Sequence, residues 1–450
     1  MDFSVLTKGQ KEVYQKFVQF LLDPKENNLI IQGSAGTGKS FLTKYLVEEG
    51  IKNYRAQCNV LGLPIKYKDY DVCATTHKAV ESLSNQITLP NGKPIVTLAS
   101  LLGLRVWFNY EKQKEELVDN GNQTTVIREH IVFIDECSMI SKDAFEFINL
   151  KLVKCKVIFI GDKYQLPPVK EKLSAIYSCH YPEVELTELV RNAGKPALME
   201  LCEQLKDTCK TGEWKDIHSV PGSIEVIKDN FEMEKLFRQM FKEPNVMQRV
   251  IAYSNKIVVA YAQYISELRG EKDYLTEGEW YVSNAYYAHS SFQQDQRLHI
   301  ESPVMVVEIR EVPDERIYSD QFGITNEEII SQKPLKYVKF YSPNLHLYWW
   351  DYVFATPEYY LEYLKSIHKQ SVTQWNYIKS RILDLRKADS CTIHKAQGAT
   401  LDTVLIDLYD ISHCKQKEQT ARLLYVAASR AKNKVIFYGE LNKRYGVNVA

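Results

Sequence analysis

The sequence lacks several features that would point to particular classes of protein. Its nine cysteines form no Cys-x-x-Cys pair, and no apolar run approaches the roughly 18 residues that a membrane-spanning helix needs. Scattered, unclustered cysteines favour reduced thiols and argue against a zinc site. The first ten residues have no apolar stretch typical of a signal peptide. We therefore expect a cytoplasmic protein with no zinc and no membrane span.

The chain also lacks net charge, because 57 Lys and Arg residues balance 57 Asp and Glu. A protein that coats nucleic acid by bulk charge alone is excluded, but one local basic groove is not, since steering depends on where charge lies. With 450 residues, 45% of them apolar, the chain can form packed cores and about three domains. Aromatic residues are abundant at 12%, and these fill cores or stack on nucleic-acid bases.

Short apolar runs alternate with helical patterns over residues 1–182. We expect strands at 29–31, 71–74, 131–134 and 157–160, and helices at 10–22 and 40–49. Continuous apolar runs separated by helices are typical of buried parallel strands. This part of the chain is therefore predicted to be a doubly wound α/β domain.

The same pattern returns at 250–253, 404–406 and 435–438, which predicts a second α/β domain made of residues 183–274 and 388–450. The stretch 275–387 between its halves is rich in Tyr, Val and Trp up to residue 356 and helix-like from Pro357 to Arg386. We expect an inserted β-rich module with a helical arm. Most of its aromatic side chains are expected in a core: Trp280, Tyr281, Tyr286, Tyr287, Tyr348, Trp349 and Trp350.

A phosphate-binding motif follows the first predicted strand and precedes a predicted helix. It has the full pattern G-x-x-x-x-G-K-S, as Gly33, Ser34, Ala35, Gly36, Thr37, Gly38, Lys39 and Ser40. Its glycines let backbone N–H groups face phosphate oxygens at the helix N-terminus. Lys39 would neutralise phosphate charge and the Ser40 hydroxyl would ligate Mg²⁺. An ordinary Gly-rich turn is the competing interpretation, and this context disfavours it.

Two carboxylates, Asp135 and Glu136, end the predicted strand at 131–134. Ligands of open α/β sheets bind at the carboxyl ends of the strands. Asp135 is therefore expected to hold Mg²⁺ through water, and Glu136 to activate a water as general base. A charged strand end has no function by itself, but together with the phosphate motif it indicates nucleotide hydrolysis.

Further short strings occur in a fixed order along 6–191, 249–256 and 390–438. They are Leu6-Thr7 with Gln10, Ala74 to Ala79, Thr97 to Leu102, Asp135 to Met139, Gly161 to Pro168, Leu186 to Arg191, Thr392 to Gly398, and Tyr425 to Ala431. Each string is weak alone, but their joint order and spacing are specific. In these strings the sequence resembles the superfamily 1 helicases of the RecD-like, 5′-to-3′ branch.

The resemblance implies two RecA-like P-loop NTPase domains that bind ATP in the cleft between them. Gln10 would then contact adenine, for which an amide offers a matched donor and acceptor. Gln165 would sense the γ-phosphate, and Gly398 would lie near the nucleotide. Arg191 and Arg430 match the arginine fingers of the family, whose guanidinium groups bridge phosphoryl oxygens as Lys cannot.

The resemblance also implies a nucleic-acid track across both domains. The matching residues are Thr75, Thr76, His77, Lys78, Thr392, His394 and Lys395. Hydroxyls, imidazoles and backbone N–H groups suit phosphate oxygens, which carry position without sequence. The string at 97–102 departs from the family, because Ala99 stands where His is common. Ser100 is the remaining polar candidate there.

A β-ribbon is expected as an insertion at 105–128. Alternation at 106–110, an Asn-Gly turn at 120–121 and the segment 124–127 suggest two strands joined by a charged stretch. By resemblance this is the place of the pin that splits duplex DNA. Trp107 or Phe108 would stack on the junction base pair, or else merely pack the ribbon onto its domain.

The sequence therefore predicts an ATP- and Mg²⁺-dependent DNA helicase, with its 5′-to-3′ direction and an SH3-like inserted module taken from the resemblance. Single-stranded and forked DNA are the expected partners, with a single-strand-binding or replication protein as a further candidate partner, and a monomer is expected. One alternative is a DNA-stimulated ATPase that translocates or displaces proteins without unwinding. A P-loop phosphotransferase is another, but it has no use for Arg430 in a second α/β domain. A pure binding module needs no general base such as Glu136.

Overall fold

The computed structural model describes residues 3–109, 114–120, 125–168, 171–188, 195–293, 296–311, 335–368 and 382–450, with only the backbone at 106–109, 114–115 and 367–368. The chain divides into two compact units, Met1–Lys215 with Gln416–Ser429 and Asp216–Lys415 with Arg430–Ala450. No helix in the described part of the chain is long and apolar enough to cross a bilayer.

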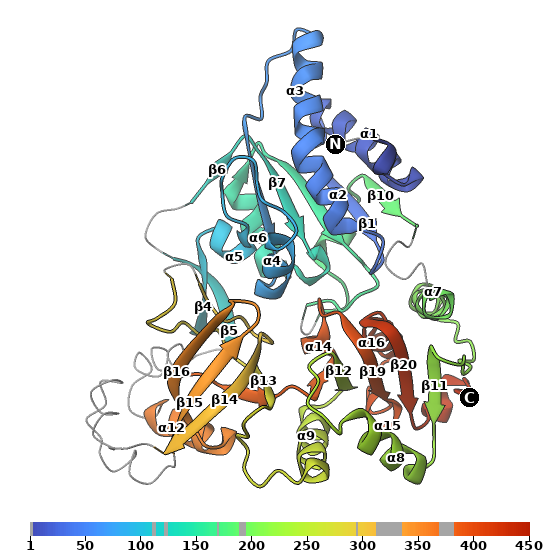
Figure 1. Ribbon diagram of the computed structural model, residues 1–450. Helices are drawn as coiled ribbons and strands as arrows, with labels where there is room; N and C mark the ends of the chain where they lie inside the picture. Colours follow the sequence, from blue (N-terminus) through green and yellow to red (C-terminus); the bar gives the residue numbers. More distant parts are fainter. Residues whose placement is uncertain are drawn as a thin grey trace. The chain divides into compact units, whose positions relative to one another are not determined.

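A six-stranded parallel sheet in the order β10-β1-β9-β7-β2-β3 organises the first unit (Figure 1). Its strands are β1 (Asn28–Gly33), β2 (Asp69–Ala74), β3 (Val96–Thr97), β7 (His130–Asp135), β9 (Lys156–Gly161) and β10 (Glu183–Leu186). The four strands expected in this region are confirmed. Their side chains are buried on both faces, which is why each reads as a continuous apolar run.

Helices cover both faces of this sheet. One apolar core joins it to α1 (Lys8–Leu22), α2 (Lys39–Tyr45), α3 (Ile51–Val60) and α4 (His77–Ser84), and the other to α5 (Leu98–Leu101) and α6 (Lys142–Lys151). Short 3₁₀ turns lie at η1 (Phe3–Val5), η3 (Cys137–Met139) and η4 (Ala175–Ser178). The unit also contains α7 (Pro196–Thr211), which packs against α16 (Lys417–Ala428).

The helix expected at 40–49 continues further than predicted. A π-helical turn, η2 (Leu46–Gly50), joins α2 directly to α3. Gly50 keeps an ordinary helical φ of −64°. A Cβ there would lie 2.8 Å from the Phe17 ring, so glycine allows α1 to pack closely and does not end the helix.

The β-ribbon is present, but its predicted strand pairing is wrong. β4 (Leu104–Asn109) pairs antiparallel with β5 (Lys114–Asp119), with Trp107 opposite Glu116. The second strand is thus the charged stretch. Among the residues described after it, Ile127–Arg128 form β6, which pairs with β8 (Leu152–Val153). Charged residues hid β5 because they leave no apolar run in the sequence.

The second unit contains a five-stranded parallel sheet in the order β11-β20-β19-β12-β18. Its strands are β11 (Ile224–Ile227), β12 (Gln248–Ala252), β18 (Ser390–Thr392), β19 (Leu401–Asp407) and β20 (Ala431–Tyr438). Helices α8 (Asn230–Met240) and α9 (Asn255–Arg269) share an apolar core with one face. The shorter helices are α14 (Ile393–Ala396), α15 (Leu408–Ile411) and η5 (Lys443–Tyr445). The second α/β sheet is thereby confirmed.

An antiparallel sheet in the order β16-β15-β14-β13-β17 lies in the chain between β12 and β18. Its elements are β13 (Trp280–Ser283), β14 (Pro303–Glu311), β15 (Leu335–Ser342), β16 (Leu347–Phe354), α12 (Pro357–His368) and β17 (Leu385–Lys387). The helical prediction holds over α12 but is wrong at its end. Leu385 and Arg386 form a strand because they pair with β13.

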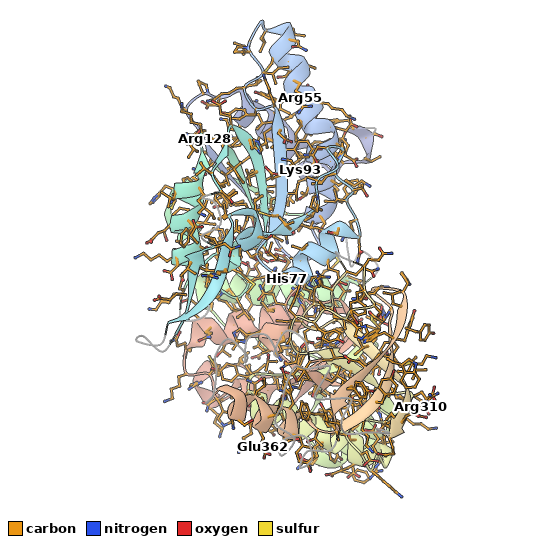
Figure 2. The ribbon with its side chains drawn as sticks, turned by 90° about the vertical axis from the view of Figure 1, so that its left-hand side faces the viewer. Arg55, His77, Lys93, Arg128, Arg310 and Glu362 are labelled. Atoms are coloured by element: carbon orange, nitrogen blue, oxygen red, sulfur yellow. The ribbon has the colours of Figure 1, made fainter. Side chains whose placement is uncertain are left out.

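Fewer aromatic side chains of this module are buried than expected. Tyr281, Tyr287 and Trp349 lie in its core, whereas Tyr286 is 39% and Tyr348 60% exposed. On the outer face of β15 and β16, the Trp350 ring stacks 4.7 Å from that of Tyr337. The Arg310 guanidinium, labelled in Figure 2, lies 4.5 Å from the Trp350 ring centre. Such cross-strand pairs stabilise a sheet without being buried.

Candidate nucleotide-hydrolysis site

The phosphate motif forms the loop between β1 and α2. Gly36 and Gly38 have φ of +90° and +78°, a conformation that residues with a Cβ rarely adopt. Gly38 precedes α2 without a side-chain cap. The first N–H groups of α2 are therefore available to an anion, as at other phosphate-binding helix N-termini.

Side chains of the motif hold the loop in shape. The Lys39 ammonium donates to the carbonyl oxygens of Gly33 at 2.8 Å and Ser34 at 3.1 Å. The Thr37 hydroxyl donates to the Ser34 carbonyl at 2.9 Å. A cation held only by neutral carbonyls is readily drawn to the stronger charge of a phosphate. Ser40 lies half-buried in the first turn of α2.

Asp135 and Glu136 stand at the carboxyl end of β7, next to β9 and β2. Burial and the charge of Glu136 raise the pKa of Asp135 to about 7, although Lys39 opposes the shift. Asp135 Oδ1 and Glu136 Oε2 are buried and have no hydrogen-bond partner among the described residues. Buried carboxylate oxygens without a partner are costly, so this pair fits a hydrated cation and a water.

The described residues contain no group of three His, Cys, Asp or Glu side chains placed to hold a metal ion. Mg²⁺ commonly keeps several waters and takes one or two protein oxygens together with substrate phosphates. Asp135 and the Ser40 hydroxyl match that modest requirement. The residues present therefore fit an ion that is shared with a nucleotide.

Glu136 has an unusual backbone conformation, which Thr75 supports. Its φ of +53° is left-handed, and such strain in a residue other than glycine is often found at functional sites. The Thr75 hydroxyl donates to the Glu136 carbonyl at 3.1 Å. Thr75, which was expected to contact nucleic acid, thus uses its hydroxyl proton in a bond to the backbone of Glu136.

Gln165 lies in the loop Asp162–Gln165 after β9, here named the sensor loop. Gln165 is 2% exposed and Asp162 is fully buried. Asp162 Oδ1 accepts from the Tyr164 N–H at 3.0 Å and from Gln32 Nε2 at 3.4 Å. Because Gln32 precedes Gly33 in β1, these bonds connect the sensor loop to the start of the phosphate loop.

Gln10 lies near the phosphate loop, but both ends of its amide are engaged. Its Oε1 accepts from the Thr7 N–H at 3.1 Å in a capping box at the start of α1. Its Nε2 donates to the Thr37 carbonyl at 3.4 Å. An adenine contact would therefore exchange one of these partners.

The two matched His-Lys strings have the same local geometry. Thr76 caps α4 by accepting from the Ala79 N–H at 3.2 Å, and Thr392 caps α14 by accepting from the Lys395 N–H at 3.4 Å. Each hydroxyl keeps its proton for donation. Exposed histidines follow, His77 in α4 and His394 in α14, the former labelled in Figure 2.

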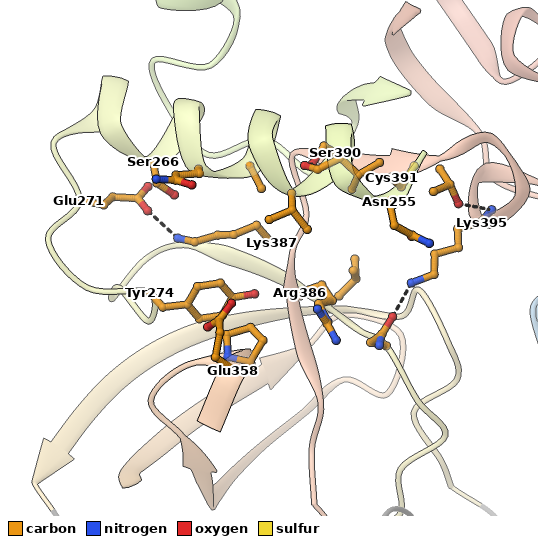
Figure 3. A pocket seen from close by; sticks show the side chains of 18 of the residues that line it. Asn255, Ser266, Glu271, Tyr274, Glu358, Arg386, Lys387, Ser390, Cys391 and Lys395 are labelled. Atoms are coloured by element: carbon orange, nitrogen blue, oxygen red, sulfur yellow. Dashed lines mark hydrogen bonds and ion pairs between the residues drawn. The ribbon is translucent and has the colours of Figure 1, made fainter. Parts of the chain in front are cut away.

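Lys395 also reaches a pocket of about 810 Å³ in the second unit, shown in Figure 3. Residues of α9, β17, β18 and the start of α12 line it. The Lys395 ammonium donates to the Asn284 amide oxygen, and Lys387 pairs with Glu271 at 2.5 Å. The pocket thus joins a predicted nucleic-acid residue to the inserted module.

The structure also gives positions for four further predicted site residues. Ser100 is exposed, with its N–H bonded to Thr97. Lys78 is half-buried in α4, Gly398 follows α14 with a φ of +77°, and Arg430 is 4% exposed at the first position after Ser429. Arg191 and the side chains of Trp107 and Phe108 lie outside the described residues.

Sequence reasoning gave no role to two residues of α16 that contact the sensor loop. Arg422 donates to the carbonyl of Gln165, and Tyr425 donates to Asp162. Tyr425 belongs to a recognised string, and Arg422 precedes it by three residues, which places both on one helix face. This three-residue spacing is the sequence signal that could have assigned a role to Arg422.

Comparisons with known proteins agree with this arrangement. The AAA domain family matches residues 20–171, and the UvrD-like helicase C-terminal domain family matches 387–438. The chain is 25% identical to the ATP-dependent DNA helicase dda of Enterobacteria phage T4, over 97% of this chain and 100% of that protein. It is 31% identical to the Pif1 DNA helicase of Campylobacter jejuni over 34% of this chain and 32% of that protein.

The fold has known counterparts as well. The structure of the Pif1 helicase from Candida albicans covers 99% of this chain and 96% of its own, with a TM-score of 0.52 at 17% identity. The two parallel sheets are those of two RecA-like domains. In its ordered motifs, its two family matches and its full-length relative, the chain is similar to the superfamily 1 helicases of the Pif1 and RecD-like branch.

Proposed function

We propose that the chain is an ATP-dependent DNA helicase that moves 5′ to 3′ along single-stranded DNA and opens forked duplex. The observation that carries the proposal is the pair of buried, unpartnered carboxylate oxygens of Asp135 and Glu136 beside a complete phosphate loop. A protein that only binds nucleotide needs no such pair. The direction of movement rests on the resemblance to the helicases of that branch.

In this proposal Ser40 and Asp135 would hold Mg²⁺, which would neutralise charge on the phosphates when bound. Glu136 accepts a proton from the attacking water. Lys39, Arg191 and Arg430 meet the charge that develops on the transferred phosphoryl group, and Gln165 orients the water. Thr76, His77, Thr392 and Lys395 contact the phosphates of the strand and carry no sequence preference.

ATPase and unwinding assays on 5′-tailed and 3′-tailed DNA test this function. Lys39→Ala and Glu136→Gln should each abolish DNA-stimulated hydrolysis, whereas Lys44→Ala at the end of α2 should retain it. Unwinding from 3′ tails alone would refute the direction. Normal hydrolysis by Glu136→Gln would refute the general base.

A second candidate is a DNA-stimulated ATPase that translocates or displaces proteins. It is distinguished by the ribbon of β4 and β5, the place of the predicted pin. Truncating Trp107 or Phe108 should lower strand separation while hydrolysis persists. Equal loss of both activities would refute the wedge role of these residues.

A further inference from the structure

Tyr425 of α16 links the phosphate loop to the sensor loop within the first unit. Its hydroxyl donates to Asp162 Oδ2 at 2.6 Å and accepts from the Ala35 N–H at 3.4 Å. The side chain is 1% exposed. One hydroxyl group therefore contacts both loops on which nucleotide hydrolysis is proposed to depend.

Arg422, one turn earlier on α16, holds the same sensor loop. Its Nη1 donates to the carbonyls of Lys163 and Gln165, the latter at 3.1 Å. Its Nη2 lies 3.3 Å from Glu418 Oε1. The backbone that carries Gln165 is thus fixed by two side chains of one helix.

Tyr425 resists loss of its hydroxyl proton. Burial, and then the charge of Asp162, raise the pKa of Tyr425 well above its usual value. The phenol therefore stays protonated and remains a donor. Hydrogen bonds to an ionised acceptor are among the stronger ones in proteins.

The weaker bond, from Ala35, is the one that can change. Backbone N–H groups of a phosphate loop turn toward phosphate oxygens when a nucleotide binds. A phosphate would then compete with the Tyr425 hydroxyl for the Ala35 N–H.

We propose that Tyr425, supported by Arg422, is a positioning residue that couples nucleotide occupancy of the phosphate loop to the placement of Gln165. The inference rests on the proposed ATPase function. Tyr425 does not itself touch the reacting atoms. Tyr425 instead sets the position of Gln165, the proposed γ-phosphate contact, once a nucleotide occupies the phosphate loop.

Tyr425→Phe tests this role because it removes only the hydroxyl. DNA-stimulated kcat should fall about tenfold, which is the effect of losing one charge-assisted hydrogen bond. KM for ATP and the Kd of ADP should change by less than about twofold, since the other loop N–H groups remain. A structural role alone would lower Tm and leave the ratio of stimulated to unstimulated kcat unchanged.

The matched control is Tyr281→Phe, because the Tyr281 hydroxyl donates to the Tyr274 carbonyl at 2.6 Å and the side chain is fully buried in the inserted module. It should match the wild type in kcat. An equal fall in both variants, or wild-type kcat and stimulation in Tyr425→Phe, would overturn the inference.

Should Tyr425→Phe fail to fold, Arg422→Lys tests the same loop. It keeps the charge but loses the planar donor pair, and should lower stimulated kcat in the same direction. Wild-type stimulated kcat in that variant would overturn the inference. An inactive wild-type protein would instead refute the proposed function, so the two failures are distinguishable.

Discussion

Asp135 in the first unit and Glu279 in the second are both buried carboxyl groups whose pKa is raised to about 7, yet their surroundings differ. Burial is the largest cause for both, followed by Glu136 for Asp135 and by Glu271 for Glu279. Asp135 has a buried oxygen without a partner. Glu279 accepts from Arg269 at 2.7 Å and from the Trp280 N–H at 3.0 Å.

The partners of Glu279 form a buried ion network at one joint of the second unit. Arg269, the last residue of α9, also pairs with Asp389 at 2.7 Å, while Lys387 of β17 pairs with Glu271. These residues lie where the chain leaves the parallel sheet for the inserted module and where it returns. We therefore expect the acid with an unpartnered oxygen, Asp135, to act in a reaction, and the paired acid, Glu279, to stabilise a structural joint.

The strongest test of this difference is Asp135→Asn, which should lower DNA-stimulated turnover by about 100-fold or more. The same change should raise Tm by a few degrees at pH 8. Because the pKa of Asp135 is higher in the folded state than its ordinary 3.8, the folded protein loses stability as pH rises from about 4 to 7. The amide avoids that loss. If thermal unfolding at pH 8 gives Asp135→Asn a Tm below that of the wild type, the predicted stabilisation is wrong.

Breaking the paired network around Glu279 should lower stability and leave nucleotide binding nearly unchanged. Arg269→Ala leaves Glu279 and Asp389 without their cation, which should cost about 3–5 kcal/mol of unfolding free energy. The Kd of ADP should change little, because the phosphate loop lies in the first unit. Arg238→Ala, which removes an exposed pair with Glu234, is the control and should cost under about 0.5 kcal/mol. Equal losses in denaturant unfolding would refute the distinction.

The smallest effect is expected for Glu279→Gln. The pKa of Glu279 stands above its ordinary 4.5, so the stability that it contributes at low pH is lost as pH rises from about 5 to 7. The charged groups around it are Arg269, Lys387, Glu271 and Asp389. The variant should show a shallower fall of Tm between pH 5 and 8. A slope equal to that of the wild type would contradict the assignment.

Locally encoded features could be predicted from the sequence. The strand ending in Gly33, the phosphate loop and the carboxylates at the end of β7 were found because buried parallel strands and glycine turns leave compact patterns. The role of Tyr425 was not predicted, since its partners Ala35 and Asp162 are distant in sequence, and neither was the pairing of Arg269 with Asp389, 120 residues further along the chain. β5 was missed because its charged residues leave no apolar run, although Leu117 packs against a core of the first unit. The outer aromatic residues were placed wrongly because apolar character suggested a core.

The insertion between β12 and β18 has a consequence for how the protein is made. These two strands are neighbours in the parallel sheet, but a ribosome must synthesise the whole inserted module between them. At about 5–20 residues per second, the edge of β12 waits on the order of ten seconds for its neighbour. The module can pair its own strands meanwhile, so we expect the inserted part to fold before the domain that surrounds it.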